Sequence, residues 1–434
     1  MIRIENFNVS TLTSSKFLCS LFIVIMCTQF VGIEGYGVSP LKVALMGLAP
    51  IFFLMNNPRI NKAVVFGSLF FISCVLCAYM AGPVRWSTVI YQGMFIFIFV
   101  CFYSLLRQGE IQLDSFKRFL KYFIYTYCIV LILQQICLLM GLKNFILINL
   151  ANQYYLAIDK LPLLTQEPSS SARILAVLML GYLRCTEIGT GSKPHLSELF
   201  SEENRWVTIL FLYAMTTMGS GTAYICLGIL SCYFINRKSA IYIIPLVASL
   251  VFLSDYFEIK QLSRVKATIE ATATGDSDIV IETDQSASSR ILPLLNLVTK
   301  TDLSDKTSWF GKGTSTKEEK ENWFRTFTKA RVSIVDQYGL LTFLFSLVLV
   351  YSCIIKRIFS IESLFFIIIF GLSLMNVAYV WGAMMIFAAV RYFQEQEESG
   401  TLEFAEEELD EDMEERLIEE RSRLTDGEDL QPNT

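Results

Sequence analysis

The chain has 434 residues, of which 53% are hydrophobic, and it contains 34 Phe and 19 Tyr. Its apolar residues form runs of roughly 15 to 22 residues, close to the length that a helix needs to cross a hydrocarbon core about 30 Å thick. This composition excludes an ordinary soluble domain and predicts an all-α, polytopic integral membrane protein. The formal net charge of −5 is distributed unevenly along the chain.

The apolar runs predict about twelve transmembrane helices. The first run, Phe17–Ile33, is followed by Glu34-Gly35-Tyr36 rather than by a small-residue cleavage site, so we expect an uncleaved anchor. The expected spans are residues 14–33, 40–56, 62–82, 87–106, 118–141, 171–183, 206–218, 221–235, 239–253, 338–356, 361–375 and 377–391.

Lys and Arg gather in every second connection between these spans. The positive-inside rule therefore predicts that the N-terminus and the C-terminus are both cytoplasmic. Two long connections, about 142–170 and 254–337, then lie on the outer face of a transmembrane body formed by residues 1–393. The basic residues that set this orientation are Arg59, Lys62, Arg107, Lys117, Arg118, Arg184, Lys193, Arg205, Arg237, Lys238, Lys356 and Arg357.

The first outer loop ends in the sequence EPSSSAR, residues 167–173, which leads into an apolar helix. Pro168 biases Glu167 toward an extended conformation, and the hydroxyls of Ser169–Ser171 can cap the helix. Arg173, expected in the first turn, opposes the helix dipole and requires an anionic partner. That partner is either Glu167, in a capped helix start, or a bound phosphate.

A short connection, Met218–Thr222, joins two later spans with few residues to spare. Its small residues allow close helix approach, and they also leave backbone amides near the outer surface. Ser220 and Thr222 are its hydroxyl-bearing members.

The second outer loop contains Ser288-Ser289-Arg290, which repeats the pattern of hydroxyls followed by an arginine. Two arginines on one membrane face can form a forked clamp for a pyrophosphate, although Arg290 taken alone is equally consistent with an ordinary surface residue. The loop also contains Asp276 and Asp278. In so polar a segment a solvated loop is favoured over a cation site, and we expect neither a metal nor a cofactor.

The same loop ends in a glycine-rich turn, Phe310–Gly313, which contains Lys312, and in a basic segment. This segment is either a solvated basic face or a surface that attracts anions. Its basic residues are Lys317, Lys320, Arg325, Lys329 and Arg331.

Residues 394–434 form an acidic, cytoplasmic tail. From Glu395 onward there are 17 acidic residues against 3 basic ones, a net −14, which leaves the body at +9 with 33 basic and 24 acidic residues. A solvated, partly helical segment is the favoured interpretation; a partner-binding or an appended segment are the others.

The 11 cysteines lie mostly inside apolar runs, without metal-binding spacing, so we interpret them as small buried hydrophobic residues. The single histidine, His195, falls in a cytoplasmic connection.

Together these features resemble the Wzy-type O-antigen and capsule polysaccharide polymerases of the O-antigen polymerase and ligase superfamily. The resemblance covers most of residues 1–395 and depends on the order of several short motifs. They are Glu167-Pro168-Ser169, Ser220-Gly221-Thr222, Ser288-Ser289-Arg290, Phe310–Gly313 and the Tyr338-Gly339-Leu340-Leu341 opening of the next span.

The resemblance implies a GT-C-like glycosyltransferase of the bacterial inner membrane. Such an enzyme joins undecaprenyl-pyrophosphate-linked oligosaccharide repeat units, donor and acceptor, on the periplasmic face. A chain-length regulator protein is a further possible partner, and no nucleic acid is expected. The implied catalytic residues are Glu167, Arg173 and Arg290, and the implied substrate-binding residues are Ser169, Ser220, Thr222, Ser289, Lys312 and Arg331.

The chemistry of such a transfer fits these residues. Arginines stabilise the negative charge that develops on a leaving pyrophosphate, and a carboxylate held partly out of water takes the proton of the acceptor hydroxyl. Glu167 is the first candidate for this base, with Asp255 and Glu258 in reserve.

Three other functions remain open. An O-antigen ligase, which transfers glycan to lipid A core, resembles this chain but has a functional histidine where Phe327, Thr328 and Lys329 stand, which favours the polymerase. A lipid-linked oligosaccharide flippase needs charges along its spans, which are nearly free of them here. A secondary transporter would show inverted repeats, and we find none.

Overall fold

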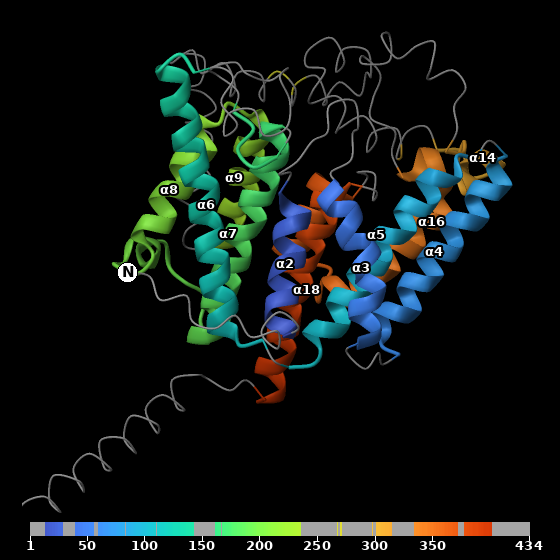
Figure 1. Ribbon diagram of the computed structural model, residues 1–434, viewed down its shortest axis with the longest axis horizontal. Coiled ribbons are helices and arrows are strands. Elements are labelled where there is room, and N and C mark those ends of the chain that lie inside the picture. The colour runs from blue at the N-terminus through green and yellow to red at the C-terminus, as the bar shows by residue number, and fades with distance from the viewer. Residues whose placement is uncertain are drawn as a thin grey trace, which may run out of the picture.

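The computed structural model describes residues 14–28, 40–55, 60–82, 84–109, 111–142, 161–165, 167–235, 301–314, 334–371 and 377–401, with single positions at 267, 270 and 297. The described residues form helices and no strand (Figure 1). The predicted all-α class is therefore confirmed for this part of the chain.

The helices follow one another in an up-and-down bundle (Figure 1). The first five are α2 (Ser15–Cys27), α3 (Pro40–Met55), α4 (Lys62–Ala81), α5 (Trp86–Leu106) and α6 (Leu113–Leu139). The next are α7 (Pro168–Thr190), the short η2 (Leu196–Phe200), α8 (Arg205–Thr217) and α9 (Gly221–Phe234). The last are α14 (Lys306–Phe310), α16 (Ile334–Leu349) with the π-helical turn η4 (Val350–Ile354), α17 (Ile361–Phe365) with η5 (Phe366–Phe370), and α18 (Ala378–Ser399).

Four helical segments in the described part are long and apolar enough to cross a membrane. They are Lys62–Ala81, Trp86–Leu106, Leu113–Leu139 and Ile334–Ile354, and shorter apolar helices occur at Ser15–Cys27, Lys42–Leu54, Gly221–Phe234 and Ile361–Phe370. A helix occupies every expected span except residues 239–253, which lie outside the described residues. The protein is thus a helical membrane protein, and the total of twelve spans stays a prediction.

The two most buried helices, α7 and α18, lie side by side at the centre of the bundle and run in the same direction. Gly181 permits this packing, since a Cβ there would lie 2.9 Å from Ile386 of α18. Gly382 of α18 does the same toward α2, where a Cβ would lie 2.5 Å from Cys27 Sγ. Trp381 of α18 is fully buried against Phe95 and Phe99 of α5. Helices covered by protein need not be as apolar as helices that face lipid, which allows α7 to carry arginines.

The two ends of the bundle differ in charge. At the end where α5, α7 and α18 finish, which we call the charged end, ion pairs link neighbouring helices. Arg107 pairs with Glu395 of α18, Arg184 with Glu362 at 2.5 Å, and Lys117 with Glu203 at 3.1 Å. Because α18 runs to Ser399, Glu395 and Glu398 belong to the folded body, although the predicted tail begins at 394.

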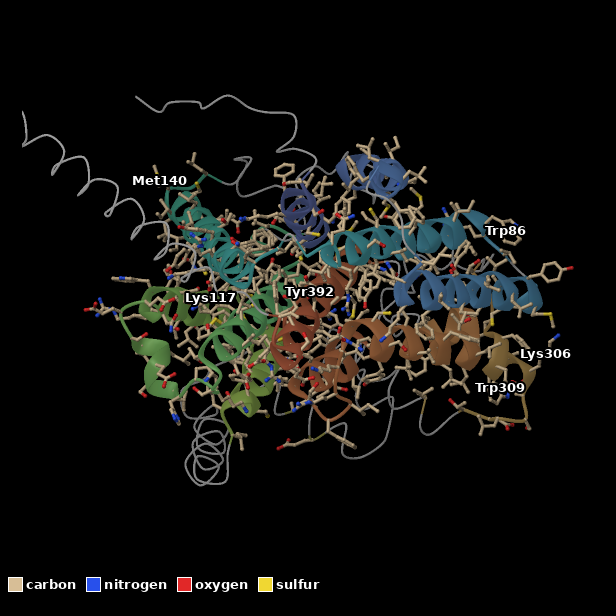
Figure 2. The ribbon with its side chains drawn as sticks, turned by 90° about the horizontal axis from the view of Figure 1, so that it is seen from below. Trp86, Lys117, Met140, Lys306, Trp309 and Tyr392 are labelled. Atoms are coloured by element: carbon tan, nitrogen blue, oxygen red, sulfur yellow. The ribbon has the colours of Figure 1, made fainter. Side chains whose placement is uncertain are left out.

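The opposite end, where α6 finishes and α7, α9, α16 and α18 begin, is called the loop end (Figure 1). One side of it is built by α14 and the turn that follows. Asp305 caps α14, and hydrogen bonds from the hydroxyl and the N–H of Thr307 lower the pKa of Asp305. Lys306 and Trp309 of α14 lie on the same side of the bundle as Trp86 of α5 (Figure 2).

The glycine-rich turn after α14 interlocks with the start of α16. Gly311 and Gly339 both have left-handed φ angles, +78° and +79°, and each leaves room for the backbone of the other segment. A Cβ on Gly339 would lie 2.1 Å from the carbonyl oxygen of Trp309. The N–H groups of Lys312 and Gly313 donate to the carbonyls of Asp336 and Gln337 at 2.7 and 3.2 Å. Two sequence motifs, Phe310–Gly313 and Tyr338–Leu341, therefore form one structural unit.

This interlock predicts that Gly339→Ala lowers the stability of the protein more than the same change at a glycine that also has a positive φ but has no atom near the added Cβ. Left-handed strain alone costs about 1–3 kcal/mol, and the contact with Trp309 adds to it. The measurement is the melting temperature of the purified protein in detergent.

Two controls separate the causes. Gly82→Ala has a φ of +95° but meets no atom within 4 Å, so it tests the strain alone. Gly228→Ala lies inside α9 with nothing within 4 Å and should not lower stability. Equal losses for Gly339→Ala and Gly82→Ala would contradict the interlock.

Candidate functional site

Six buried side-chain atoms of the described residues have no hydrogen-bond partner, and they lie in the first three turns of α5, α7, α9 and α16. Buried polar groups in proteins are normally paired, so each of these atoms needs an explanation. Among them only Arg173 carries a full charge. In the described part of the chain these atoms are Gln92 Nε2, Arg173 Nε, Thr222 Oγ1, Gln337 Oε1, Tyr338 Oη and Thr342 Oγ1.

Arg173 is buried inside the protein, with 1% of its surface exposed. Its Nη1 donates to the hydroxyl of Tyr379 on α18 at 2.5 Å, and its guanidinium carbon lies 5.6 Å from the centre of that ring. It forms no ion pair with any residue that the structure describes. Arg173 is the sixth residue of α7, so the expectation that it lies in the first turn is wrong.

Glu167 is the N-cap residue of α7 and is partly exposed. Its backbone is extended, with φ −136° and ψ 141°, which confirms the effect predicted for the following Pro168. One carboxylate oxygen accepts a hydrogen bond from Ser169 Oγ at 3.1 Å. Of the two partners considered for Arg173, Glu167 does not form an ion pair with it; the guanidinium bonds Tyr379.

The serines after Pro168 do not cap the helix with their hydroxyls, contrary to the sequence-based expectation. The N–H groups of Ser170 and Ser171 bond the Glu167 carbonyl at 3.0 and 3.2 Å. The Ser171 hydroxyl instead donates backward to the Pro162 carbonyl at 2.6 Å and contacts Thr165 Oγ1 at 2.9 Å. These hydroxyls tie the preceding turn, residues 161–165, to the start of α7.

That turn contains Leu163, which has a left-handed φ of 55° and is buried. A non-glycine residue in this region is strained and persists only when its surroundings hold it. Gln134 of α6 supplies the restraint, because its amide donates to the Leu163 carbonyl and accepts from the Leu163 N–H, both at 3.0 Å. The backbone that leads to Glu167 is therefore fixed from α6.

The connection between α8 and α9 lies beside this turn. The Leu161 N–H donates to the Met218 carbonyl at 3.3 Å, and α9 packs against α7. Ser220 is the N-cap residue of α9 without a side-chain cap bond, and Thr222 is buried with its hydroxyl unpartnered. The structure thus brings Glu167, Ser169 and Arg173 to the same part of the loop end as Ser220 and Thr222.

Lys312 is exposed in the interlocked turn beside α14, on the other side of the bundle from α7 (Figure 1). No contact joins it to Arg173, so these two predicted site residues are not brought together. Ser289, Arg290 and Arg331 lie outside the described residues, as do the reserve carboxylates Asp255 and Glu258. Within the described ranges no three His, Cys, Asp or Glu side chains are placed to hold a metal ion.

Comparisons with protein-family models, with curated proteins and with solved structures give no match.

Sequence reasoning missed three residues that shape this region. Tyr379 and Gln134 lie far along the chain from the residues they bond, and local patterns carry no signal of such contacts. Lys42 is buried in α3, which corrects the view that the spans are nearly free of charge. It is the only charged residue in the segment 40–55, and that isolation is a signal that was available.

The restraint on Leu163 predicts that Gln134→Met lowers the melting temperature. The change leaves a buried N–H and a buried carbonyl unpaired, and each unsatisfied group costs about 1–3 kcal/mol. Gln135→Met is the matched control, since the Thr217 hydroxyl that it bonds also reaches the Tyr213 carbonyl at 2.8 Å. A loss in Gln134→Met no larger than in the control would show that the turn is held by other contacts.

Proposed function

We propose that this protein is a polysaccharide polymerase that joins lipid-pyrophosphate-linked oligosaccharide repeat units. The observation that carries the proposal is a buried arginine, Arg173, which has no carboxylate partner in the described part of the chain and follows the partly exposed Glu167 by six residues at the loop end of the bundle. A cation that stabilises the leaving pyrophosphate and a base that accepts the proton are the two elements that this transfer requires.

Arg173 suits the leaving group. Tyr379 engages only Nη1, so the Nε side of the guanidinium is not used by any residue in the described part of the chain. A guanidinium edge binds two oxygens of a phosphate in a planar fork, and such a contact is strongest away from bulk water. As the bond between the anomeric carbon and the pyrophosphate oxygen breaks, Arg173 stabilises the negative charge that remains on the lipid pyrophosphate.

Glu167 suits the acceptor. The acceptor hydroxyl attacks the anomeric carbon, forms the new glycosidic bond and gives its proton to a base. Glu167 is reachable because it is only partly buried, and Ser169 and the extended backbone before Pro168 fix the position of its carboxylate. Ser220 and Thr222 supply hydroxyls nearby for the sugar.

The wider setting is part of the same proposal. The twelve-span, GT-C-like body would lie in a bacterial inner membrane with both termini in the cytoplasm. The ion-paired charged end would face the cytoplasm, as the positive-inside rule expects, and the loop end the periplasm. The partners would be the undecaprenyl-pyrophosphate-linked donor and acceptor, the bilayer and a chain-length regulator.

The orientation predicts opposite labelling of cysteines placed at the two ends. With exposed Cys232 replaced by serine, Lys312→Cys should react with a membrane-impermeant maleimide in intact spheroplasts. Glu398→Cys should react only after permeabilisation, since Glu398 pairs with Lys356 at the charged end. The reverse pattern would invert the topology and remove Glu167 from the periplasmic face.

The base role predicts that Glu167→Gln slows elongation by about 10²–10⁴-fold, the usual scale of general-base catalysis, while donor binding survives. Glutamine keeps the volume and the hydrogen bond to Ser169 but cannot take the proton. The assay uses purified protein with lipid-linked repeat units, and product length is read on a gel.

The matched control is Glu203→Gln, which removes an exposed carboxylate from the charged end. Near-normal elongation by a well-folded Glu167→Gln protein would reject the base role. The absence of elongation by the native protein, with glycan transferred to lipid A core instead, would favour the ligase.

A further inference from the structure

Three arginines in the described part of the chain lie over tyrosine rings. The ring electrons attract a guanidinium but do not neutralise it, so an arginine of this kind still needs an anion when it is shielded from water. Two of these clusters are at the charged end and one is at the loop end. The guanidinium carbons lie 5.2 to 5.6 Å from the ring centres, in the pairs Arg107–Tyr103, Arg184–Tyr233 and Arg173–Tyr379.

The two clusters at the charged end are completed by carboxylates. Arg107 donates from Nη2 to the hydroxyl of Tyr103 at 2.9 Å and also to the carboxylate of Glu395. Arg184 donates from Nε and Nη2 to the two carboxylate oxygens of Glu362, at 2.5 and 3.2 Å. In both clusters, therefore, the guanidinium contacts a tyrosine and a carboxylate.

The cluster at the loop end lacks the carboxylate. Arg173 donates from Nη1 to the hydroxyl of Tyr379 at 2.5 Å, but its buried Nε has no hydrogen-bond partner. It forms no ion pair with any residue that the structure describes. Yet Arg173 is buried, whereas Arg184 is partly buried and Arg107 is exposed. Within the described residues, the arginine most shielded from water thus has the least compensation of its charge.

The two edges of a guanidinium explain what Tyr379 does to Arg173. Nε and Nη2 form one edge, and Nη1 lies on the other side of the central carbon. Arg184 uses the edge with Nε to bind the two oxygens of Glu362, and a phosphate offers two oxygens in a similar arrangement. Because Tyr379 engages Nη1, it leaves the edge with Nε for an anion of this kind.

Helix packing fixes the position of Tyr379. It lies in the first turn of α18, which packs along α7 in the same direction. A long side chain such as that of Arg173 loses rotamer freedom when a ligand fixes it, and this loss weakens binding. The hydrogen bond at Nη1 and the ring beside the guanidinium restrict Arg173 before the ligand arrives, which favours tighter binding.

We propose that Tyr379 is a positioning residue, which holds the guanidinium of Arg173 so that its Nε edge binds a phosphate or pyrophosphate group. The anion takes the place that carboxylates occupy beside Arg107 and Arg184. That the anion is the pyrophosphate of the lipid-linked donor rests on the proposed function; the action of Tyr379 through Arg173 does not.

The test uses the purified, full-length protein in detergent and measures how inorganic pyrophosphate raises its melting temperature. The native protein should be stabilised. Tyr379→Phe keeps the ring but cannot accept from Nη1, so it should raise the midpoint concentration about tenfold, the scale of one hydrogen bond to a charged group. Tyr103→Phe removes the matching hydroxyl beside Arg107 at the charged end and should leave the midpoint unchanged.

A double variant separates positioning from direct contact with the anion. Arg173→Gln should raise the midpoint at least as far as Tyr379→Phe does, and the two changes together should raise it no further than Arg173→Gln alone, because Tyr379 acts through the guanidinium. A further rise in the double variant would mean that Tyr379 binds the anion itself, which contradicts the proposal. A native midpoint in Tyr379→Phe, whatever its melting temperature, would reduce Tyr379 to a structural contact. Tyr379→Leu serves if Tyr379→Phe does not fold, and it must also raise the midpoint.

Further measurements keep this proposal apart from the proposed function. If Tyr379 and Arg173 control the midpoint but the native protein does not elongate lipid-linked repeat units, the positioning role stands and the polymerase is rejected. Elongation by the native protein together with an unchanged midpoint in Tyr379→Phe rejects the positioning role alone. In nanodiscs, phosphatidylglycerol that abolishes the Tyr379-dependent response would assign the anion to a lipid headgroup and not to the donor. A native protein that pyrophosphate does not stabilise overturns the proposal.

Discussion

The close packing of α7 against α18 is the contact on which the arrangement of the site depends. Gly181 and Gly382 remove side chains where neighbouring helices approach, and this lets α18 sit among α2, α5 and α7. Because α7 and α18 run in the same direction, both begin at the loop end, and Arg173 meets Tyr379 there. Larger residues at the glycine positions would separate the helices and expose the guanidinium.

A second constraint follows from the membrane. Each charge placed within the hydrocarbon region must be paired, solvated or functional. At the charged end the charges are paired. Interhelical ion pairs include Arg184, which donates from two nitrogens to the two carboxylate oxygens of Glu362. At the loop end Arg173 and Lys42 have no carboxylate partner among the described residues. The contrast between the two ends is a better guide to function than the overall net charge.

Local chemistry made part of this predictable from the sequence. Runs of apolar residues located the helices, since length and hydrophobicity are properties of contiguous residues, and Pro168 set the backbone of Glu167 because its effect reaches only one residue. The span expected at 171–183 is shorter than α7, which begins at Pro168 and continues to Thr190, because a helix does not end where its apolar residues end.

Contacts between distant segments could not be predicted. Tyr379 bonds Arg173, which lies 206 positions away in the sequence. Gln134 bonds both the N–H and the carbonyl of Leu163, and no sequence motif predicts this pair of hydrogen bonds. The serines of residues 169–171 were assigned to capping by a local rule, but Ser171 bonds Pro162 because the preceding turn folds back onto the helix. The order of short motifs favoured a family; the contact between Arg173 and Tyr379 required the fold.

The interlock of Gly311 with Gly339 has a consequence for how the chain tolerates change in length. It joins the chain on either side of the segment 315–333. Residues added to or removed from that segment therefore change the length of a loop with fixed ends and do not shift α16 along its axis. Doubling the length of a flexible closed loop costs only about 0.6 kcal/mol in closure entropy. The segment between the two motifs is therefore free to diverge in length and composition, while α14 and α16 keep their register.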